Sequence, residues 1–365
     1  TPPDNLAGLV LLAPLAGTDD LFIQNAFRLM QLAEPALNAA ADKSAAVLAT
    51  VSRLNGHFGM AGGGAVADAL SGGLAGLAKT AGHEWPDVAC KAFDLSVDLV
   101  DDNATAKMLV AELLVDGAQE IGFSSKGLHT LSLVEASLSG EPQDSPVSYG
   151  DVVVISGGAR GVTAEVAIAL AASSRATLLL LGRSESPQTE PAWLEGLSSE
   201  AEIKKAVIAN ADSPLKPKDV GRMCQQILGN REIQDSLRRI KAAGGQALYR
   251  SVDLRDSGAV AAVIKEVRDE YGPIKGLIHG AGVLADRLIK DKTAEQFEQV
   301  YSTKIAGLRN LLAAVAEESL SFMVMFSSST GRYGRTGQVD YAVANEILNK
   351  IAQQEAGRRA DCRVL

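Results

Sequence analysis

Four side chains in the last quarter of the chain have the types and the order needed for carbonyl chemistry: Ser328, Tyr341 and Asn345, with Lys304 upstream. Together they can protonate a carbonyl oxygen while a hydride arrives at its carbon. A phenol is a poor acid near neutral pH because its unperturbed pKa is about 10, so a tyrosine acid needs a nearby cation. Lys304 is the candidate cation. Taken singly, Tyr341 fits a packed aromatic and Lys304 a solvated charge, and only the combination favours catalysis.

The elements around these residues are predicted by local patterns. Residues 321–329 form a short apolar run that ends in hydroxyls, which predicts a buried parallel strand with Ser328 at its carboxyl edge. Open α/β sheets bind ligands at that edge. An apolar-periodic segment runs from Tyr341 to about Gly357 and predicts a helix. Residues four apart share one helix face, so Tyr341 and Asn345 should point the same way.

A glycine-rich loop lies earlier in the chain, at residues 151–163, with the sequence Asp-Val-Val-Val-Ile-Ser-Gly-Gly-Ala-Arg-Gly-Val-Thr. An apolar strand runs directly into the glycines, and a helical pattern follows at residues 164–171. Glycines let the backbone turn tightly and approach a pyrophosphate, which the amides of the following helix stabilise. The pattern predicts a dinucleotide site.

The next strand, residues 176–182, ends at Arg183 and Ser184, where a carboxylate would favour the ribose hydroxyls of NAD. Arginine suits a 2′-phosphate instead, so together with Arg160 in the glycine loop it favours NADPH as the cofactor. Both arginines also fit ordinary surface charges, Arg160 more readily than Arg183.

These motifs occur in the order Ser-Gly-Gly-Ala-Arg-Gly, His279-Gly-Ala-Gly282, Phe-Ser-Ser and Tyr-x-x-x-Asn. The order resembles the short-chain dehydrogenase/reductase superfamily, and more narrowly the ketoreductase domains of polyketide and fatty-acid synthases. Ordinary members carry Tyr-x-x-x-Lys and an asparagine on the earlier helix. Synthase ketoreductases exchange the two residues, as this chain does with Lys304 and Asn345.

The resemblance implies roles for single residues. Ser328 would hydrogen-bond the substrate carbonyl, Tyr341 would donate the proton, Lys304 would make the tyrosine a better acid, and Asn345 would hold the site and its relay water. Asp253 would contact the adenine. The full set expected to bind cofactor is Ser156, Gly157, Gly158, Arg160, Gly161, Val162, Arg183, Ser184, Asp253, Leu254, Gly280, Ala281 and Gly282. One departure is Thr163, which stands where the family usually has its third glycine.

Length and composition limit the number of domains and the classes of function that the chain can have. A chain of 365 residues suggests two units. A balance of 35 basic and 44 acidic side chains, net charge −9, argues against binding nucleic acid as the main function. Three cysteines and four histidines lack metal-ligand spacing, so we expect no metal site, and reduced thiols fit a cytoplasmic location. No apolar stretch reaches membrane-spanning length, and no signal peptide is indicated.

The first half repeats the alternation of strands and helices without the chemistry. Apolar runs at residues 6–12, 45–51, 89–95 and 118–123 alternate with helical patterns near 21–39, 65–81 and 105–115. The glycines between Gly59 and Gly76 could be mistaken for a nucleotide loop, and we favour close helix packing instead. The resemblance implies a truncated, cofactor-free structural subdomain here. We therefore expect two Rossmann-like α/β units: residues 1–146, structural, and residues 147–365, a catalytic doubly wound parallel sheet that binds NADPH. The boundary falls in residues 139–146.

The connection between Arg183 and Gln246 is long, and residues 213–217 interrupt helical patterns on both sides. Such an insertion resembles ketoreductases of polyunsaturated-fatty-acid synthases. The chain ends as another strand opens at Cys362, whereas the family continues into a substrate lid, so we expect the lid to be missing.

The leading hypothesis is an NADPH-dependent β-ketoacyl reductase that acts on an acyl chain carried by the phosphopantetheine of an acyl carrier protein, beside other synthase domains. The alternatives are a stand-alone reductase of small ketones and a non-catalytic scaffold module. Leu284-Ala285-Asp286 partly matches the Leu-Asp-Asp of family members that form (3R) alcohols. Tyr333 occupies the position of the tryptophan typical of the opposite hand, so Asp286 and Tyr333 predict (3R) stereochemistry.

Overall fold

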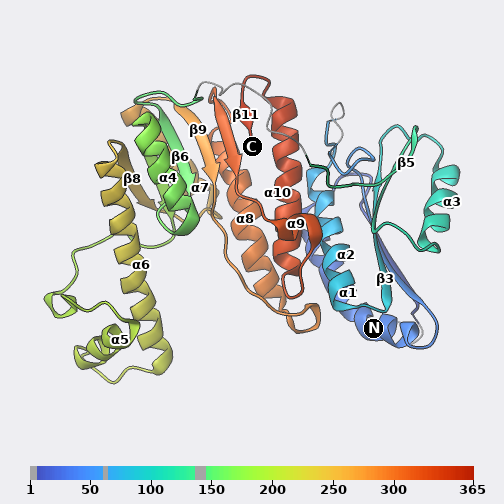
Figure 1. The fold of residues 1–365 in the computed structure, drawn as a ribbon, viewed down its shortest axis with the longest axis horizontal. Coiled ribbons are helices and arrows are strands. Elements are labelled where there is room, and N and C mark those ends of the chain that lie inside the picture. The colour runs from blue at the N-terminus through green and yellow to red at the C-terminus, as the bar shows by residue number, and fades with distance from the viewer. Residues whose placement is uncertain (1–5, 61–64, 136–144) are drawn as a thin grey trace. The chain divides into compact units, whose positions relative to one another are not determined.

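The computed structural model describes residues 6–60, 65–135 and 145–365 (Figure 1). It contains two compact units. The first consists of Thr1–Gln143, Gly282–Ala306 and Met325–Leu365, and the second of Asp144–Ala281 and Gly307–Val324. The first unit therefore joins the amino-terminal half to two later segments of the chain. The division of the sequence at residue 146 stays a prediction, because these units follow contacts rather than chain order.

The first sheet has five strands in the order β1-β2-β3-β4-β5. The first four are parallel, and β5 is antiparallel to β4. The strands are β1 (Gly8–Leu12), β2 (Ala46–Ser52), β3 (Val88–Leu95), β4 (Glu120–Ser124) and β5 (Gly127–His129). The four expected strands are present, whereas the short β5 was not predicted because a three-residue strand carries no measurable alternation.

Helices cover both faces of this sheet: α1 (Asp20–Ala41), the 3₁₀ turn η1 (Ala69–Gly72), α2 (Gly73–Glu84) and α3 (Asp102–Leu113). Ala92 packs with Ala75 and Ala78 of α2. Its neighbour Phe93 packs with Leu109 of α3. Successive side chains of a strand point to opposite faces, so α2 and α3 lie on opposite sides of β3.

The second sheet has the order β11-β10-β9-β6-β7-β8. β6 pairs in parallel with β7 and β9, and β7 pairs in parallel with β8. The strands are β6 (Val152–Ser156), β7 (Thr177–Gly182), β8 (Gln246–Ser251), β9 (Ile274–His279), β10 (Phe322–Met325) and β11 (Arg363–Val364). Read from β8, this is the 3-2-1-4-5-6 order of dinucleotide-binding sheets, with the switch point between β6 and β9. The expected α/β class is confirmed.

The remaining helices are α4 (Gly161–Ser174), α5 (Glu200–Ala209), α6 (Pro217–Ala242), α7 (Ser257–Tyr271), α8 (Ala294–Ala314), α9 (Ser329–Tyr333) and α10 (Val339–Arg358), with 3₁₀ turns η2 (Ala192–Leu194) and η3 (Ile289–Asp291). α5 and α6 form the expected insertion between β7 and β8. They are separated at residues 213–217, where Pro217 begins α6 at a position that tolerates its missing N–H. In Figure 1 these two helices are drawn in yellow-green and olive.

The glycines of α2 allow it to pack directly on α10, and Figure 1 shows the two helices side by side. A Cβ atom on Gly76 would lie 2.7 Å from the backbone nitrogen of Val343, and one on Gly73 would lie 2.7 Å from Ile347 Cδ1. The interpretation of these glycines as packing residues is therefore correct at Gly73 and Gly76. Residues 61–64 of the glycine-rich stretch lie outside the described residues.

Candidate active site

Tyr341 and Asn345 lie one turn apart on α10, which begins at Val339. Tyr341 is half-buried, and Asn345 is fully buried. The Asn345 amide donates through Nδ2 to the carbonyl oxygen of Tyr341 at 2.8 Å. Its Oδ1 atom is buried and has no hydrogen-bond partner among the described residues. A buried acceptor of this kind requires a partner, and a water molecule would satisfy it.

Lys304 lies on α8 and is 3% exposed. Its Nζ atom is 5.8 Å from the centroid of the Tyr341 ring and donates to the carbonyl oxygen of Phe326 at 2.7 Å. Burial disfavours the ammonium cation and lowers the pKa of Lys304 to about 8. The lysine therefore remains mostly charged at pH 7 and becomes neutral as the pH rises through 8.

Ser328 follows β10 and caps helix α9. Its Oγ atom accepts a hydrogen bond from the amide of Thr330 at 3.1 Å, and the side chain is half-buried. The strand ends at Met325, so Ser328 lies three residues beyond the strand rather than at its last position. The bond from Lys304 to Phe326 ties the lysine to the segment that leads to Ser328. All four residues belong to the first compact unit.

The glycine-rich loop of the second unit follows β6. Gly157 has φ +71°, and a Cβ atom there would lie 2.9 Å from the backbone nitrogen of Ala281, so a side chain is excluded. Ser156 and His279 are fully buried at the ends of β6 and β9, with Ser156 Oγ 2.8 Å from His279 Nδ1. Ser156 Oγ also accepts from the amide of Ala281 at 3.4 Å. The serine and histidine hold the two loops of the switch point together.

Thr163, the departure from the family pattern, is accommodated by Gly280. A Cβ atom on Gly280 would collide with the Thr163 side chain, which is buried. The missing third glycine is thus offset by a glycine on the facing loop.

Arg160 forms an ion pair with Glu232 of α6, from its Nε atom at 2.7 Å. The amide of Gly161, at the start of α4, donates to the same carboxylate at 3.1 Å. Gly161 has φ +58°, and Val162 beside it is exposed. The sequence did not reveal Glu232, because one carboxylate in a long helix of mixed charge gives no signal.

Arg183 and Ser184 are exposed after β7. The Tyr249 hydroxyl donates to the carbonyl oxygen of Ser184 at 2.8 Å, which fixes the backbone of this turn. Hydrogen bonds from Arg255, aided by the charge of Arg183, lower the pKa of Asp253 to about 2. Asp253 therefore carries a negative charge throughout the physiological range, and it lies near enough to Arg183 to feel that charge.

Leu254 is buried, and its carbonyl oxygen accepts from Asn310 Nδ2 at 2.8 Å. A Cβ atom on Gly158 would lie 2.5 Å from Ile155 Cγ2, so the loop closes tightly onto its own strand. The open glycine turn, the amides at the start of α4 and the exposed arginines fit a phosphate-bearing nucleotide. A cofactor phosphate at Gly161 would have to replace the Glu232 carboxylate.

Gly282 lies beside Lys304, since a Cβ atom there would be 3.9 Å from Lys304 Nζ. Asp286 is exposed, and its carboxylate accepts from Gln338 Nε2 at 3.0 Å. Tyr333 is 50% exposed, with the Arg332 guanidinium 5.5 Å from its ring centroid. Asp286 therefore takes part in a defined contact, which a freely solvated loop charge would lack.

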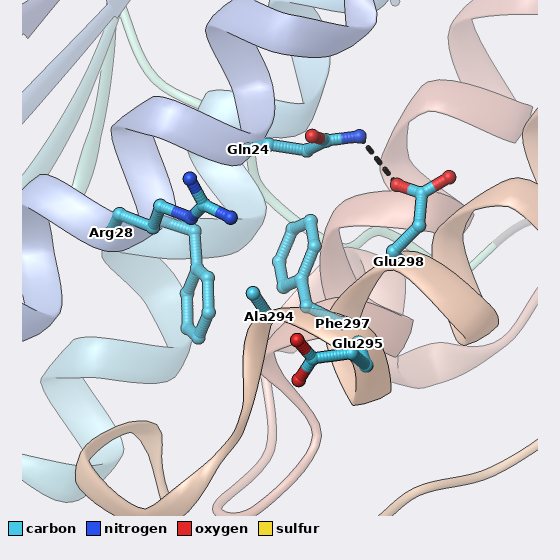
Figure 2. A pocket seen from close by; sticks show the side chains of 7 residues that line it. Gln24, Arg28, Ala294, Glu295, Phe297 and Glu298 are labelled. Carbon is cyan, nitrogen blue, oxygen red and sulfur yellow. Dashed lines mark hydrogen bonds between the residues drawn. The ribbon is translucent and has the colours of Figure 1, made fainter.

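A pocket of about 220 Å³ lies elsewhere in the first unit, lined by residues of α1 and the start of α8 (Figure 2). Phe27 and Phe297 stack there with centroids 4.4 Å apart, and Gln24 Nε2 donates to Glu298 Oε2 at 2.5 Å. None of the residues expected in catalysis or cofactor binding lines it.

Two general features concern the described part of the chain. Cys90, Cys224 and Cys362 are buried, as expected of packing residues, and each has a free thiol. In residues 6–60, 65–135 and 145–365, no helix is long and apolar enough to cross a membrane, and no group of three His, Cys, Asp or Glu side chains could hold a metal ion.

Dinucleotide-dependent oxidoreductases share this strand order with a glycine loop at the switch point. Residues 151–364 match the model of the KR domain family, and because the match spans more than half of the chain, the chain belongs to that family of ketoreductase domains. It is thereby an oxidoreductase domain of the class that uses a nicotinamide cofactor.

Known relatives are large synthases. A polyunsaturated fatty acid synthase polypeptide of Thraustochytrium sp. (strain ATCC 26185 / S-3) is 36% identical over 320 residues, which make up 82% of this chain and 11% of that protein. Polyketide synthase PksL of Bacillus subtilis (strain 168) is 38% identical over 122 residues, 33% of this chain and 3% of that protein. The chain thus spans a small part of the length of these relatives.

Among solved structures, a ketoreductase domain from the bacillaene assembly line has a TM-score of 0.68 at 22% identity, covering 93% of this chain and 67% of that chain. At this identity the likeness shows the fold. Because it covers nearly the whole chain, it includes the amino-terminal sheet as well as the second one.

Proposed function

We propose that the chain is an NADPH-dependent β-ketoacyl reductase that converts a β-ketoacyl thioester on an acyl carrier protein into the (3R)-hydroxyacyl thioester, within a polyketide or fatty-acid megasynthase. The observation that carries the proposal is the group formed by Lys304, Tyr341 and Asn345, with Nζ of the lysine 5.8 Å from the centroid of the tyrosine ring. Membership of the KR domain family and similarity to large synthases support it.

A nicotinamide cofactor held by the second unit would supply the hydride that the β-carbon of the substrate requires. Tyr341 donates its phenolic proton to the carbonyl oxygen, and the charge of Lys304 stabilises the phenolate that remains. Ser328 donates a hydrogen bond to the same oxygen as negative charge develops on it. The buried Oδ1 atom of Asn345 holds a water molecule through which the tyrosine regains a proton. The carbon thus gains a hydride and the oxygen a proton, which completes the alcohol.

Cofactor choice rests on Arg183. Its exposed position after β7 suits a nucleotide whose 2′-phosphate pairs with the guanidinium. Gly157, Gly158 and Gly161 would hold the pyrophosphate, helped by the amides at the start of α4, in place of the Glu232 carboxylate that now accepts from Gly161.

Substrate orientation rests on Asp286 and Tyr333. An acidic loop on one side of the groove guides the phosphopantetheine arm from that side, so that one face of the carbonyl meets the hydride. The partial match of residues 284–286 to the Leu-Asp-Asp pattern supports the (3R) product.

The test is NADPH oxidation by the full chain with a β-ketoacyl thioester, repeated with a simple ketone and followed by chiral analysis of the product. We expect faster turnover of the thioester and a (3R) alcohol. Equal rates with the simple ketone would favour a stand-alone reductase, absence of turnover with either substrate would favour a scaffold module, and a (3S) product would overturn the assigned stereochemistry.

A further inference from the structure

Helix α2, in the amino-terminal half, presents polar side chains to two loops of the first unit. Lys79 Nζ donates to the carbonyl oxygens of Gly331 and Arg332 at 2.8 and 3.0 Å. His83 Nε2 lies 2.9 Å from the carbonyl oxygen of Tyr333. These bonds join α2 to the segment between Ser328 and Tyr341.

Glu84, the last residue of α2, contacts two loops at once. Its Oε1 atom accepts from the amide of Gly337 at 2.8 Å, and its Oε2 atom accepts from the amide of Ile289 at 2.7 Å. The two amides belong to segments that are 253 and 205 residues from Glu84 in the sequence. A carboxylate is suited to this position because both of its oxygens accept and neither donates.

Asp286 lies in the segment that leads to Ile289, and Tyr333 is the last residue of α9, directly before the loop that contains Gly337. The two segments also contact each other. The amide of Arg287 donates to the carbonyl oxygen of Gly337 at 2.9 Å, next to the bond from Gln338 to Asp286. Lys292 Nζ donates to the carbonyl oxygen of Ala285 at 2.6 Å. Hydrogen bonds thus connect Glu84, Gly337 and the segment from Arg287 to Ile289 in a closed series, and Asp286 directly precedes that segment.

We propose that Glu84 is a positioning residue that sets the relative places of the loop with Asp286 and the loop that follows Tyr333, and so determines which carbonyl face of the substrate receives the hydride. This inference rests on the proposed function. It gives the amino-terminal half of the chain a part in determining the stereochemistry of the product. Glu84 acts through the backbone amides that it binds and does not need to contact the substrate.

The test compares Glu84→Gln with Asp98→Asn in the full chain. Glutamine keeps one acceptor oxygen and turns an NH₂ group toward the other amide, so one loop is released. Asp98 is a matched control because its carboxylate also joins two loops, accepting from the amide and hydroxyl of Ser125 at 3.3 and 2.5 Å. Those loops follow β3 and β4 and are separate from residues 282–291 and 331–338.

With the N-acetylcysteamine thioester of a β-keto acid as substrate, we expect Glu84→Gln to lower the ratio of product enantiomers about tenfold, the effect of losing one charge-assisted bond. The KM for the thioester should rise while the KM for NADPH stays unchanged. Asp98→Asn should leave the enantiomer ratio as in the parent chain. An unchanged ratio in Glu84→Gln, or an equal change in both variants, would overturn the proposal.

A second measurement does not depend on turnover. Amide hydrogen exchange should accelerate in the loop that Glu84→Gln releases, residues 283–289 or 334–338, and remain unchanged in Asp98→Asn. Unchanged exchange in both segments would refute the role of Glu84, whatever the activity. If the variants show these exchange rates while the parent chain reduces no thioester, that result would contradict the proposed function and leave the loop contact supported.

Discussion

At the scale of single residues, Tyr341 gives the most direct prediction. Tyr341→Phe removes the proposed proton donor and keeps the ring that packs near Lys304, so cofactor binding should persist. Turnover should fall by about 10²–10⁴, the usual contribution of a positioned general acid. The measurement is thioester-dependent NADPH oxidation together with NADPH titration by fluorescence. Near-normal turnover would mean that another group supplies the proton.

The pKa of Lys304 predicts a pH dependence. Burial lowers this pKa to about 8, so the ammonium is present below pH 8 and is lost as the pH rises through that value. If the charge of Lys304 supports proton donation, kcat at saturating substrate should fall above about pH 8. Lys304→Arg keeps the cation at high pH and should move the fall to higher pH. An identical descending limb in parent and variant would assign it to a different group.

Arg183 predicts cofactor choice. Arg183→Ala should reduce the preference for NADPH over NADH by about 10- to 100-fold, the worth of one charge-assisted hydrogen bond. Arg222→Ala is the control, because Arg222 is an exposed arginine paired with Asp219 on α6. The measurement is the ratio of the dissociation constants for NADPH and NADH in the parent chain and in each variant. Equal affinity of the parent chain for NADPH and NADH would contradict the assignment.

The sequence predicted residues whose chemistry can be recognised from their neighbours along the chain. Gly157 and Tyr341 stand in short motifs whose order limits the possible folds. The contacts of Glu84 and Glu232 were not predicted, because each is one carboxylate in an ordinary helix whose partner is far away in the sequence. The hydrogen bond from Lys304 to Phe326 was not predicted either, because its acceptor is a backbone carbonyl, which every residue type has.

At the scale of elements, the strands were easier to predict than their ends. β6 and β7 are buried parallel strands, and their continuous apolar runs are visible without a structure. The boundary of β10 was misplaced relative to Ser328, because the hydroxyls that end the run begin a helix cap instead. Strand ends depend on pairing with neighbours, which a single sequence does not display.

The packing of α2 on α10 gives a prediction at this scale. Gly76→Ala would place a methyl group 2.7 Å from the backbone nitrogen of Val343, and overpacking of this kind costs about 1–3 kcal/mol. Gly357→Ala, on α10, meets open space and should stabilise the helix by about 0.5–1 kcal/mol. Urea denaturation would measure both changes. Equal stability of Gly76→Ala and the parent chain would mean that the helices can move apart at no cost.

At the scale of the whole molecule, the first compact unit is assembled from three stretches of chain. Helix α2 comes from the first stretch and α10 from the last. A fragment of residues 1–146 should therefore expose the glycine face of α2 and unfold at a lower temperature than the intact chain. Co-expression with residues 147–365 should restore it, as judged by co-purification through a tag on one fragment. A lone fragment that unfolds cooperatively at the temperature of the intact chain would contradict this.

The position of Glu84 has a practical consequence for recombining assembly lines. A hybrid synthase made by transplanting only residues 147–365 would join foreign loops to a resident α2 whose glutamate and glycines do not fit them. Such a hybrid could keep its cofactor and its catalytic residues and yet deliver a mixture of stereoisomers. The cassette to exchange therefore includes both halves of the chain, with recombination junctions placed outside them.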